Sequence, residues 1–289
     1  MSLLMDRHPL VFENNRSVVH LPYKFTTLLP FEEHFDPVAA ILFFQRHWHH
    51  SLCISGVYLA LCFLGVRWMR ARPAFQLRPA LVCWNWSLAL FSLLGTARCL
   101  EEAVWAVREF GFAATLCRAT DPWQPATCWA HYFALSKVVE LGDTAFLVLR
   151  KRPVLFLHWY HHVTVLVFVW HSGAELTAAG RWFVVVNFFV HSLMYAYFAV
   201  RAMGLRPPKL VSMAVTALQL SQMLLGLYVV LRVAHLKWLR QQPCQQSLQN
   251  VALGALIYLS YLFLFAKFFA DAYLRQQRPR DDEHAKKRS

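Results

Sequence analysis

Seven long apolar runs, separated by shorter polar and basic segments, dominate the pattern of the 289-residue chain. The runs cover roughly residues 52–69, 80–97, 129–149, 154–170, 182–202, 210–231 and 251–274. A helix needs about 20 mainly apolar residues to cross a hydrocarbon layer about 30 Å thick. Only helices and closed barrels satisfy their backbone hydrogen bonds inside lipid. The pattern therefore predicts an all-α integral membrane protein with seven transmembrane helices.

The polar segments between the runs predict the orientation of the chain. Lys and Arg are densest in the short segments on the side that also carries the C-terminus, such as 150–152. Because basic loops stay preferentially in the cytosol, we expect a lumenal N-terminus and a cytosolic C-terminus. The predicted organisation is a lumenal segment 1–50, a seven-helix membrane domain 51–274 and a cytosolic tail 275–289.

Composition agrees with a membrane protein. Hydrophobic residues make up 57% of the chain and charged residues 16%, whereas about 25% of a typical soluble domain is charged. The formal net charge is +13, but the basic residues lie between the apolar runs, where they report topology. No basic helix with interleaved aromatic residues lies outside the runs, so membrane lipids are expected partners and nucleic acid is not.

Two short signals agree with this orientation in the endoplasmic reticulum. Asn15 begins an Asn-Arg-Ser triplet in the lumenal segment, where it would accept an N-linked glycan. Lys286 and Lys287 stand where a cytosolic dilysine retrieval signal belongs. Such triplets and basic tails also arise by chance, so the alternative reading of each stays open.

The cysteine pattern predicts one cross-link. Cys117 and Cys244 lie in segments expected to face the oxidising lumen, so we expect a disulfide between them. It would close a loop of more than 100 residues, worth about 4 kcal/mol in the entropic account. Two unpaired cysteines are the alternative. The seven cysteines form no CxxC pair, which excludes the common zinc and redox spacings.

Ionisable residues inside the third run need a polar surrounding. Lys137, Glu140 and Asp143 lie well within it, and each charge near the centre of a bilayer costs about 2.5 to 3.5 kcal/mol on insertion scales. They must therefore face protein or water. Lys137 and Glu140 are three residues apart and can pair on one helix face. A pair that only holds helices together is the structural alternative.

The next three runs carry further polar stripes at helical spacing. The stripes are His158, His161 and His162 in the fourth run, Asn187, His191 and Tyr195 in the fifth, and Thr216, Gln219 and Gln222 in the sixth. One satisfied core histidine would be unremarkable, but three on one face need a shared environment. Four successive runs with facing polar groups predict an enclosed active site.

Imidazoles in this arrangement raise the question of a metal. Membrane di-iron enzymes need about eight histidines over three boxes, and only His158, His161, His162 and His191 lie in the right place. We therefore expect no di-iron site and assign no metal ligand, while a mononuclear site stays open. A seven-helix receptor or transporter is the third alternative, although binding alone does not require Lys, Glu, Asp and His across four spans.

Four segments together resemble a known family. Residues 137–144 (KVVELGDT), 158–162 (HWYHH), 191–195 (HSLMY) and 216–222 (TALQLSQ) match its KxxExxDT, HxxHH, HxxMY and TxxQxxQ boxes in the right order. The chain is thus similar to the very-long-chain fatty acid elongases, the ELO family of 3-ketoacyl-CoA synthases. The residues around the boxes resemble its branch for saturated and monounsaturated chains.

The resemblance implies a reaction and its substrates. A long-chain acyl-CoA condenses with malonyl-CoA and loses CO2 and CoA, which gives a 3-oxoacyl-CoA two carbons longer. It implies no bound cofactor, and the ten glycines form no GxGxxG loop for a nicotinamide. It also implies six helices around an acyl-chain tunnel, with the first span peripheral.

The resemblance also implies roles for individual residues. No cysteine lies in a box, so a histidine nucleophile is expected. His161 would carry the acyl group, with His191 across the interface and with His158 and His162 orienting the ring and stabilising charge. The supporting residues are expected to be Lys137, Glu140, Asp143, Asn187, Tyr195, Gln219 and Gln222. Lys151 and Arg206 are candidates for holding CoA.

The same resemblance names partners. They are the 3-ketoacyl-CoA reductase, the dehydratase and the enoyl reductase of the elongation cycle, in the membrane of the endoplasmic reticulum. A homo- or hetero-oligomer is compatible with this expectation.

Overall fold

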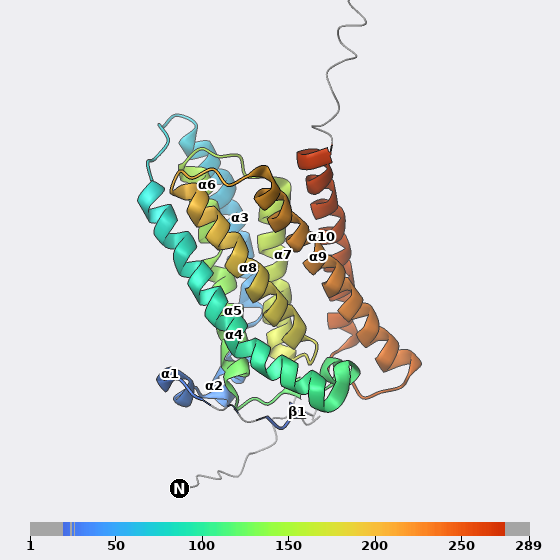
Figure 1. Ribbon diagram of the computed structural model, residues 1–289. Helices are drawn as coiled ribbons and strands as arrows, with labels where there is room; N and C mark the ends of the chain where they lie inside the picture. The colour runs from blue at the N-terminus through green and yellow to red at the C-terminus, as the bar shows by residue number, and fades with distance from the viewer. Residues whose placement is uncertain (1–19, 24, 26, 275–289) are drawn as a thin grey trace, which may run out of the picture.

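The computed structural model describes residues 20–274 except 24 and 26. The glycosylation candidate Asn15 and the retrieval candidates Lys286 and Lys287 lie outside the described residues. The longer helices run side by side, and the segment with α1 and α2 lies across one end of them (Figure 1). The element bounds, in chain order, are β1 His20–Leu21, α1 Pro30–Glu33, α2 Pro37–His47, α3 His50–Met69, α4 Arg78–Cys117, β2 Ala119–Thr120, α5 Pro125–Val139, α6 Gly142–Leu149, α7 Phe156–Glu175, α8 Gly180–Ala202, α9 Lys209–Ala234, η1 His235–Leu239, α10 Leu248–Phe269 and η2 Ala270–Leu274.

The protein is an all-α multi-pass membrane protein. Five helical stretches are long and apolar enough to cross a membrane, namely His50–Met69, Arg78–Cys117, Gly180–Ala202, Lys209–Leu239 and Leu248–Leu274. The third and fourth apolar runs form α5 with α6 and α7, which carry the polar groups and do not qualify by the same measure. Within residues 20–274, strand structure is confined to the two-residue parallel pair of β1 and β2.

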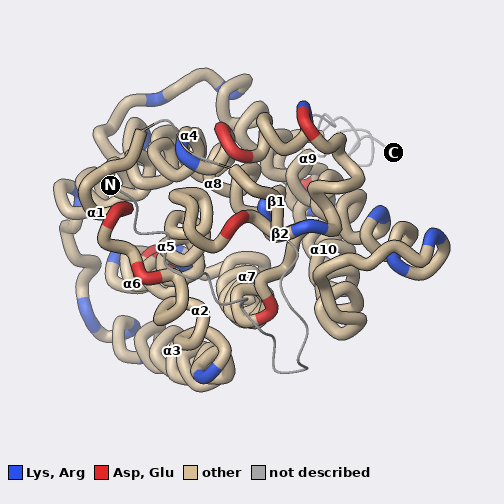
Figure 2. Tube along the Cα trace, turned by 90° about the horizontal axis from the view of Figure 1, so that it is seen from below, with Lys and Arg blue, Asp and Glu red and all other residues tan. Residues whose placement is uncertain are grey.

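Six of these helices pack in a closed cycle. In order, α4 contacts α8, which contacts α9, then α10, α7 and α5, and α5 contacts α4 again. Figure 2 looks along the helices and shows α3 at the outside of the group. There α3 packs on α6 and α7. The cycle therefore surrounds an interior to which α5, α7, α8 and α9 present their polar stripes.

The helix formed by the second apolar run, α4, is longer than that run predicts. We expected it to end near residue 97, but α4 continues to Cys117, with one non-helical residue at Gly111. The charges that suggested an end are paired within the fold. Arg98 bonds Glu32 at 2.5 and 2.8 Å, and Glu102 accepts from Arg181 at 2.7 Å. Because tertiary partners satisfy these charges, they do not stop the helix.

The third apolar run is broken instead of forming one continuous helix. α5 ends at Val139 and α6 begins at Gly142. Across the break, the N–H groups of Asp143 and Thr144 bond carbonyls three residues back, which is the tighter 3₁₀ pattern. A Cβ on Gly142 would lie 2.8 Å from the ring of Trp84, so the break needs glycine where the indole approaches.

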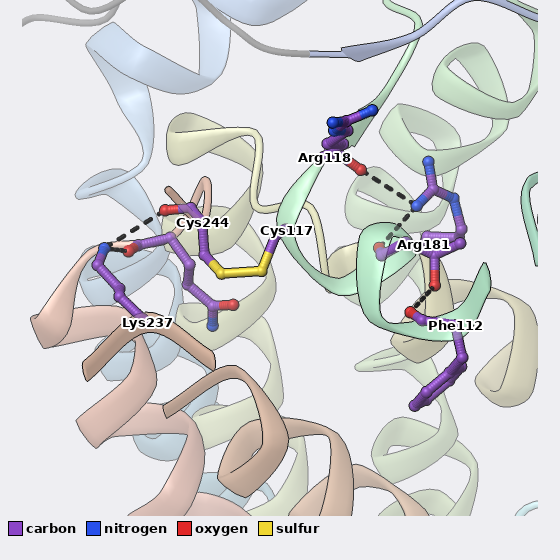
Figure 3. The surroundings of a disulfide bond; sticks show 8 residues. Phe112, Cys117, Arg118, Arg181, Lys237 and Cys244 are labelled. Carbon is purple, nitrogen blue, oxygen red and sulfur yellow. Dashed lines mark hydrogen bonds between the residues drawn. A yellow bond between two sulfur atoms is a disulfide. The ribbon is translucent and has the colours of Figure 1, made fainter. Parts of the chain in front are cut away.

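The end of the bundle near α2 is fastened by covalent and ionic links (Figure 3). Cys117 and Cys244 form the disulfide that joins the end of α4 to the segment before α10. Nearby, Lys237 donates to the carbonyls of Cys244 and Gln246. Arg181, buried in α8, donates to the carbonyls of Thr115 and Arg118 as well as to Glu102. These contacts fix the ends of α4, α8 and α10 against one another.

Candidate active site

A cavity of 660 Å³ opens inside the helix cycle, within the range of about 300 to 1,000 Å³ that is usual for small-molecule sites. Its walls come from α4, α6, α7, α8, α9 and α10 and are mostly apolar, with a concentrated set of polar side chains. Those polar side chains are Asn85, Glu140, Asp143, Arg150, Arg152, His158, His161, His162, Asn187, His191, Tyr195, Arg201, Gln219 and Gln222. All four box segments therefore contribute to the same space.

The three histidines of α7 lie together on the wall of this cavity. The ring centroids of His158 and His162 are 4.5 Å apart, and those of His161 and His162 are 5.7 Å apart. The His161 ring lies 5.0 Å from the ring of Tyr261 on α10. Leu155, in extended conformation, precedes the helix, which holds regular geometry from Phe156 to Glu175. The i, i+3, i+4 spacing thus places all three imidazoles on one surface, as the pattern predicts.

A buried charge network lies behind the histidines. Lys137, 2% exposed, donates to Glu140 at 2.7 Å and to Asn187 of α8 at 3.0 Å. His191 Nδ1 lies 3.8 Å from the second oxygen of Glu140. Lys137 is absent from the cavity walls, whereas Asn187 and His191 line them. Lys137 thus positions Glu140 and Asn187, and these two side chains, together with His191, reach the cavity.

Asp143 is held by two donors from different helices. Its carboxylate oxygens accept from Trp84 Nε1 at 2.6 Å and from Tyr195 OH at 2.8 Å. These two hydrogen bonds restrain the Asp143 carboxyl group from two different helices. Asp143 and Tyr195 both line the cavity, so the two bonds fix a carboxylate and a phenol at its wall.

The α9 residues are divided between the cavity and the packing. Gln219 and Gln222 line the cavity, and the Gln219 amide lies 3.0 Å from Met194 Sδ. Thr216 does not line it and instead bonds the carbonyl of Ser212 and the hydroxyl of Tyr273. The TxxQxxQ box thus supplies two wall residues and one residue that joins α9 to η2.

The basic residues at the cavity are not the two expected from the sequence. Lys151 donates to the carbonyls of Arg70 and Arg72, and neither Lys151 nor Arg206 is among the lining residues. Arg150, Arg152 and Arg201 line the cavity instead. Arg150 ends α6 and Arg201 is in the last turn of α8, so the positive charge gathers at one end of the cavity.

Sequence reasoning missed two aromatic residues that hold the site. Trp84 of α4 bonds Asp143, and Tyr58 of α3 bonds Thr144 at 2.7 Å. The sequence gives no reason to separate a Trp or Tyr within an apolar run from the ordinary hydrophobic core. The one sequence signal for a further role is that a buried indole N–H or phenol usually finds a hydrogen-bond partner. Among the described residues, no group of three or more His, Cys, Asp or Glu side chains is arranged to hold a metal ion.

Comparison with known proteins identifies the family to which the chain belongs. The family described as ELO: GNS1/SUR4 matches residues 43–281. Very long chain fatty acid elongase 6 of Drosophila melanogaster is 41% identical over 86% of this chain and 80% of its own length. The Homo sapiens proteins of the same name and of the name very long chain fatty acid elongase 3 are 40% and 38% identical. They align with 86% and 81% of this chain and with 93% and 86% of their own lengths.

The match covers every segment that lines the cavity, from α4 to α10. Residues from all four boxes line this one cavity. The chain belongs to the ELO (GNS1/SUR4) family and is a condensing enzyme of fatty acid elongation, a 3-oxoacyl-CoA synthase.

Proposed function

We propose that this enzyme joins a long-chain saturated or monounsaturated acyl-CoA with malonyl-CoA through an acyl-imidazole intermediate on His161. The observation that carries the proposal is the cavity itself, whose walls combine His158, His161, His162 and His191 with a largely apolar surface. An apolar wall suits an acyl chain, and clustered imidazoles suit acyl transfer, since histidine can act as a covalent nucleophile.

The first half-reaction is an acyl transfer. A ring nitrogen of His161 attacks the thioester carbonyl carbon, the C–S bond breaks, and the CoA thiolate leaves with the proton that the acylated imidazole ring gives up. The new C–N bond holds the acyl group on the enzyme. His162, whose ring centroid lies 5.7 Å from that of His161, and His158, 4.5 Å from His162, support the oxygen that becomes negative as the carbonyl is attacked.

The second half-reaction is a decarboxylative condensation. The carboxylate of malonyl-CoA leaves as CO2, and the electron pair of the broken C–C bond forms an enolate. The enolate carbon attacks the acyl carbon, the C–N bond breaks, and the leaving imidazole nitrogen takes up one proton from solvent, which returns neutral His161. The product is a 3-oxoacyl-CoA two carbons longer. His191, beside Glu140, and Asn187, fixed by Lys137, are placed to support the enolate charge.

Arg150, Arg152 and Arg201 replace Lys151 and Arg206 as the proposed contacts for CoA phosphates. They line the cavity, whereas Lys151 is engaged with backbone carbonyls. Guanidinium groups bind phosphate through paired, charge-assisted hydrogen bonds. Entry of CoA at this end leaves the acyl chain to extend between the apolar walls.

The finer architecture and the location belong to the same proposal. We infer seven spans, with α5 together with α6 and α7 as the two that the length and composition measure omits. The six-helix cycle would form the acyl tunnel, with α3 peripheral. The orientation expected from the basic loops, with a lumenal N-terminus in the endoplasmic reticulum, places the arginine end of the cavity in the cytosol. The reductases and the dehydratase of the cycle would then meet the product there.

The proposed preference for saturated and monounsaturated acyl chains rests on the residues around the boxes. The residues around the boxes favour elongase three in the saturated and monounsaturated branch. Identity with the two human relatives is nearly equal, at 40% for elongase 6 and 38% for elongase 3. A panel of saturated and monounsaturated acyl-CoAs with labelled malonyl-CoA would assign the chain length.

One purified protein tests the mechanism. Incubated with acyl-CoA alone, the enzyme should release CoA and gain acyl mass on the peptide that contains His161. His161→Ala should lose both signals. His171→Ala is a matched control, because His171 lies on the same helix but bonds Asn250 outside the cavity.

Two results would contradict the mechanism. If the wild type elongates acyl-CoA at full rate and no acylated peptide forms, the covalent step is wrong. Stoichiometric Fe or Zn in active protein would support the mononuclear alternative instead.

A further inference from the structure

A hydrogen-bonded chain connects a peripheral helix to the histidine face. Tyr58 OH of α3 lies 2.7 Å from Thr144 Oγ1, and Thr144 Oγ1 lies 2.8 Å from His158 Nε2. Tyr58 is 7% exposed and Thr144 is 3% exposed, so water does not compete for these bonds. Tyr58 belongs to none of the four boxes and does not line the cavity. Its phenol reaches the site only through Thr144.

The chain of bonds has two self-consistent directions. A hydroxyl donates one proton, so Thr144 donates either to His158 or to Tyr58. A phenol is a stronger acid than an aliphatic alcohol and is therefore the better donor. The favoured direction runs from Tyr58 to Thr144 and from Thr144 to His158 Nε2. His158 then accepts at Nε2 and carries its proton on Nδ1.

The tautomer decides what His158 can do at the cavity wall. With Nε2 engaged by Thr144, the remaining nitrogen of this cavity-lining ring is the Nδ1–H donor. A neutral donor is what an oxyanion or enolate needs, since it stabilises developing charge without a proton transfer. The reverse direction would present a lone pair and would make His158 a base.

We propose that Tyr58 is a positioning residue that, through Thr144, fixes His158 in the Nδ1–H tautomer. The proposal rests on the proposed condensation for its effect on rate. It gives the peripheral helix α3 a specific part in the chemistry, because Tyr58 belongs to α3. The ring of Tyr58 also lies 6.3 Å from the ring of His162. The histidine face is thereby held from outside the helix cycle.

The hydrogen-bonded chain Tyr58–Thr144–His158, called the relay below, is tested by substituting its members one at a time. We expect Tyr58→Phe to lower kcat about tenfold and to leave both KM values within about twofold, which is the size of one lost hydrogen bond. Thr144→Val, which keeps the shape, should give a similar loss, and Thr144→Ser should restore most of the rate. Combining Tyr58→Phe with Thr144→Val should cost no more than Thr144→Val alone.

Tyr160→Phe is the matched control. It removes a phenol on α7 that donates to Ser260 at 3.0 Å and does not line the cavity, so kcat should be unchanged. Wild-type kcat in Tyr58→Phe, or losses that multiply in the double variant, would overturn the relay.

A spectroscopic readout separates the relay from the reaction. In ¹⁵N-histidine-labelled protein, the His158 signals, identified by their loss in His158→Gln, should report protonated Nδ1 in the wild type and a mixed tautomer in Tyr58→Phe. An unchanged tautomer in Tyr58→Phe overturns the proposal even if elongation proceeds. A shifted tautomer in a protein that forms no acyl-His161 supports the relay and contradicts the proposed mechanism instead.

Discussion

At the scale of single residues, the site depends on buried charges with few partners. Lys137 pairs with Glu140, bonds Asn187, and places its ammonium 4.2 Å from the centre of the Phe133 ring. Desolvating two charges is costly, and their attraction compensates only while both are present. The loss of one partner should therefore harm the fold more than the loss of both.

We expect Lys137→Met to lower the free energy of unfolding by about 3 to 5 kcal/mol, because it leaves Glu140 as a buried and unpaired carboxylate. Lys137→Met combined with Glu140→Gln should recover a large part of that loss. Thermal unfolding in detergent measures both. Lys267→Met, on the exposed face of α10, is the control. A double variant as unstable as the single one would contradict this account.

Side-chain periodicity could predict much of the site at this scale. The spacing of His158, His161 and His162 predicts a common face, and the structure places all three at the cavity. Periodicity reports which residues share a face but not which distant residue meets them. Tyr58 and Trp84, whose partners lie far away in the chain, could therefore not be assigned to the site from the sequence. Arg152 and Arg201 contribute to the basic segments that predict the orientation of the chain, and the sequence does not show that their side chains line the cavity.

At the scale of elements, α9 and α10 depend on one close approach. The ring of Tyr258 on α10 lies directly against Gly226 of α9, where an added Cβ would overlap it. Small residues allow helices to approach in this way inside a membrane, where packing replaces the hydrophobic drive. The contact matters for the cavity because both helices belong to the cycle around it.

Gly226→Ala should destabilise the protein by about 1 to 3 kcal/mol, the usual range for overpacking. Gly56→Ala is the control, because a Cβ there meets nothing within 4 Å and alanine favours a helix by about 1 kcal/mol. The two variants should therefore shift the unfolding temperature in opposite directions. Equal shifts would show that the Tyr258 contact is unimportant.

Helix boundaries could be predicted only where hydropathy decides them. The runs that form α8, α9 and α10 are apolar enough to qualify as membrane spans in spite of their polar stripes, and their helices lie close to the predicted ranges. α4 passes its expected end because Arg98 and Glu102 find partners on other segments, which no local pattern shows. The break after Val139 fits the approach of Trp84 to Gly142, a contact between residues 58 positions apart that local periodicity does not reveal.

At the scale of the whole molecule, a buried carboxylate joins the N-terminal segment to the bundle, in addition to the pairing of β1 with β2. Glu32 of α1 accepts from Arg98 of α4 and, at 2.8 Å each, from Trp129 of α5 and the Leu29 N–H. Burial acts to raise the pKa of this carboxyl, but the hydrogen bonds from Arg98, Leu29 and Trp129 hold the pKa below its ordinary value of 4.5. The ionised form is therefore the one that the fold favours.

This link should make stability depend on pH in a defined window. Because the folded-state pKa is lowered, the contribution of Glu32 is fully present above about pH 4.5 and disappears as the pH falls through the lower folded value. The difference in unfolding temperature between wild type and Glu32→Gln should thus shrink as the pH is lowered from 6 to 3. Glu33→Gln, an exposed neighbour, is the control. A constant difference would contradict the assignment.

The broken pair α5 and α6, together with α7, also determines how the protein can be made. Five helices qualify for lipid on their own, and these three, which hold the charges of the site, do not. Lys137 obtains its amide partner Asn187 only from α8, 50 residues later in the chain. The polar layer is therefore complete only after α8 has been synthesised. We therefore expect the groups that provide the chemistry to make biogenesis cooperative, with α5, α6 and α7 reaching their final packing only once α8 is present.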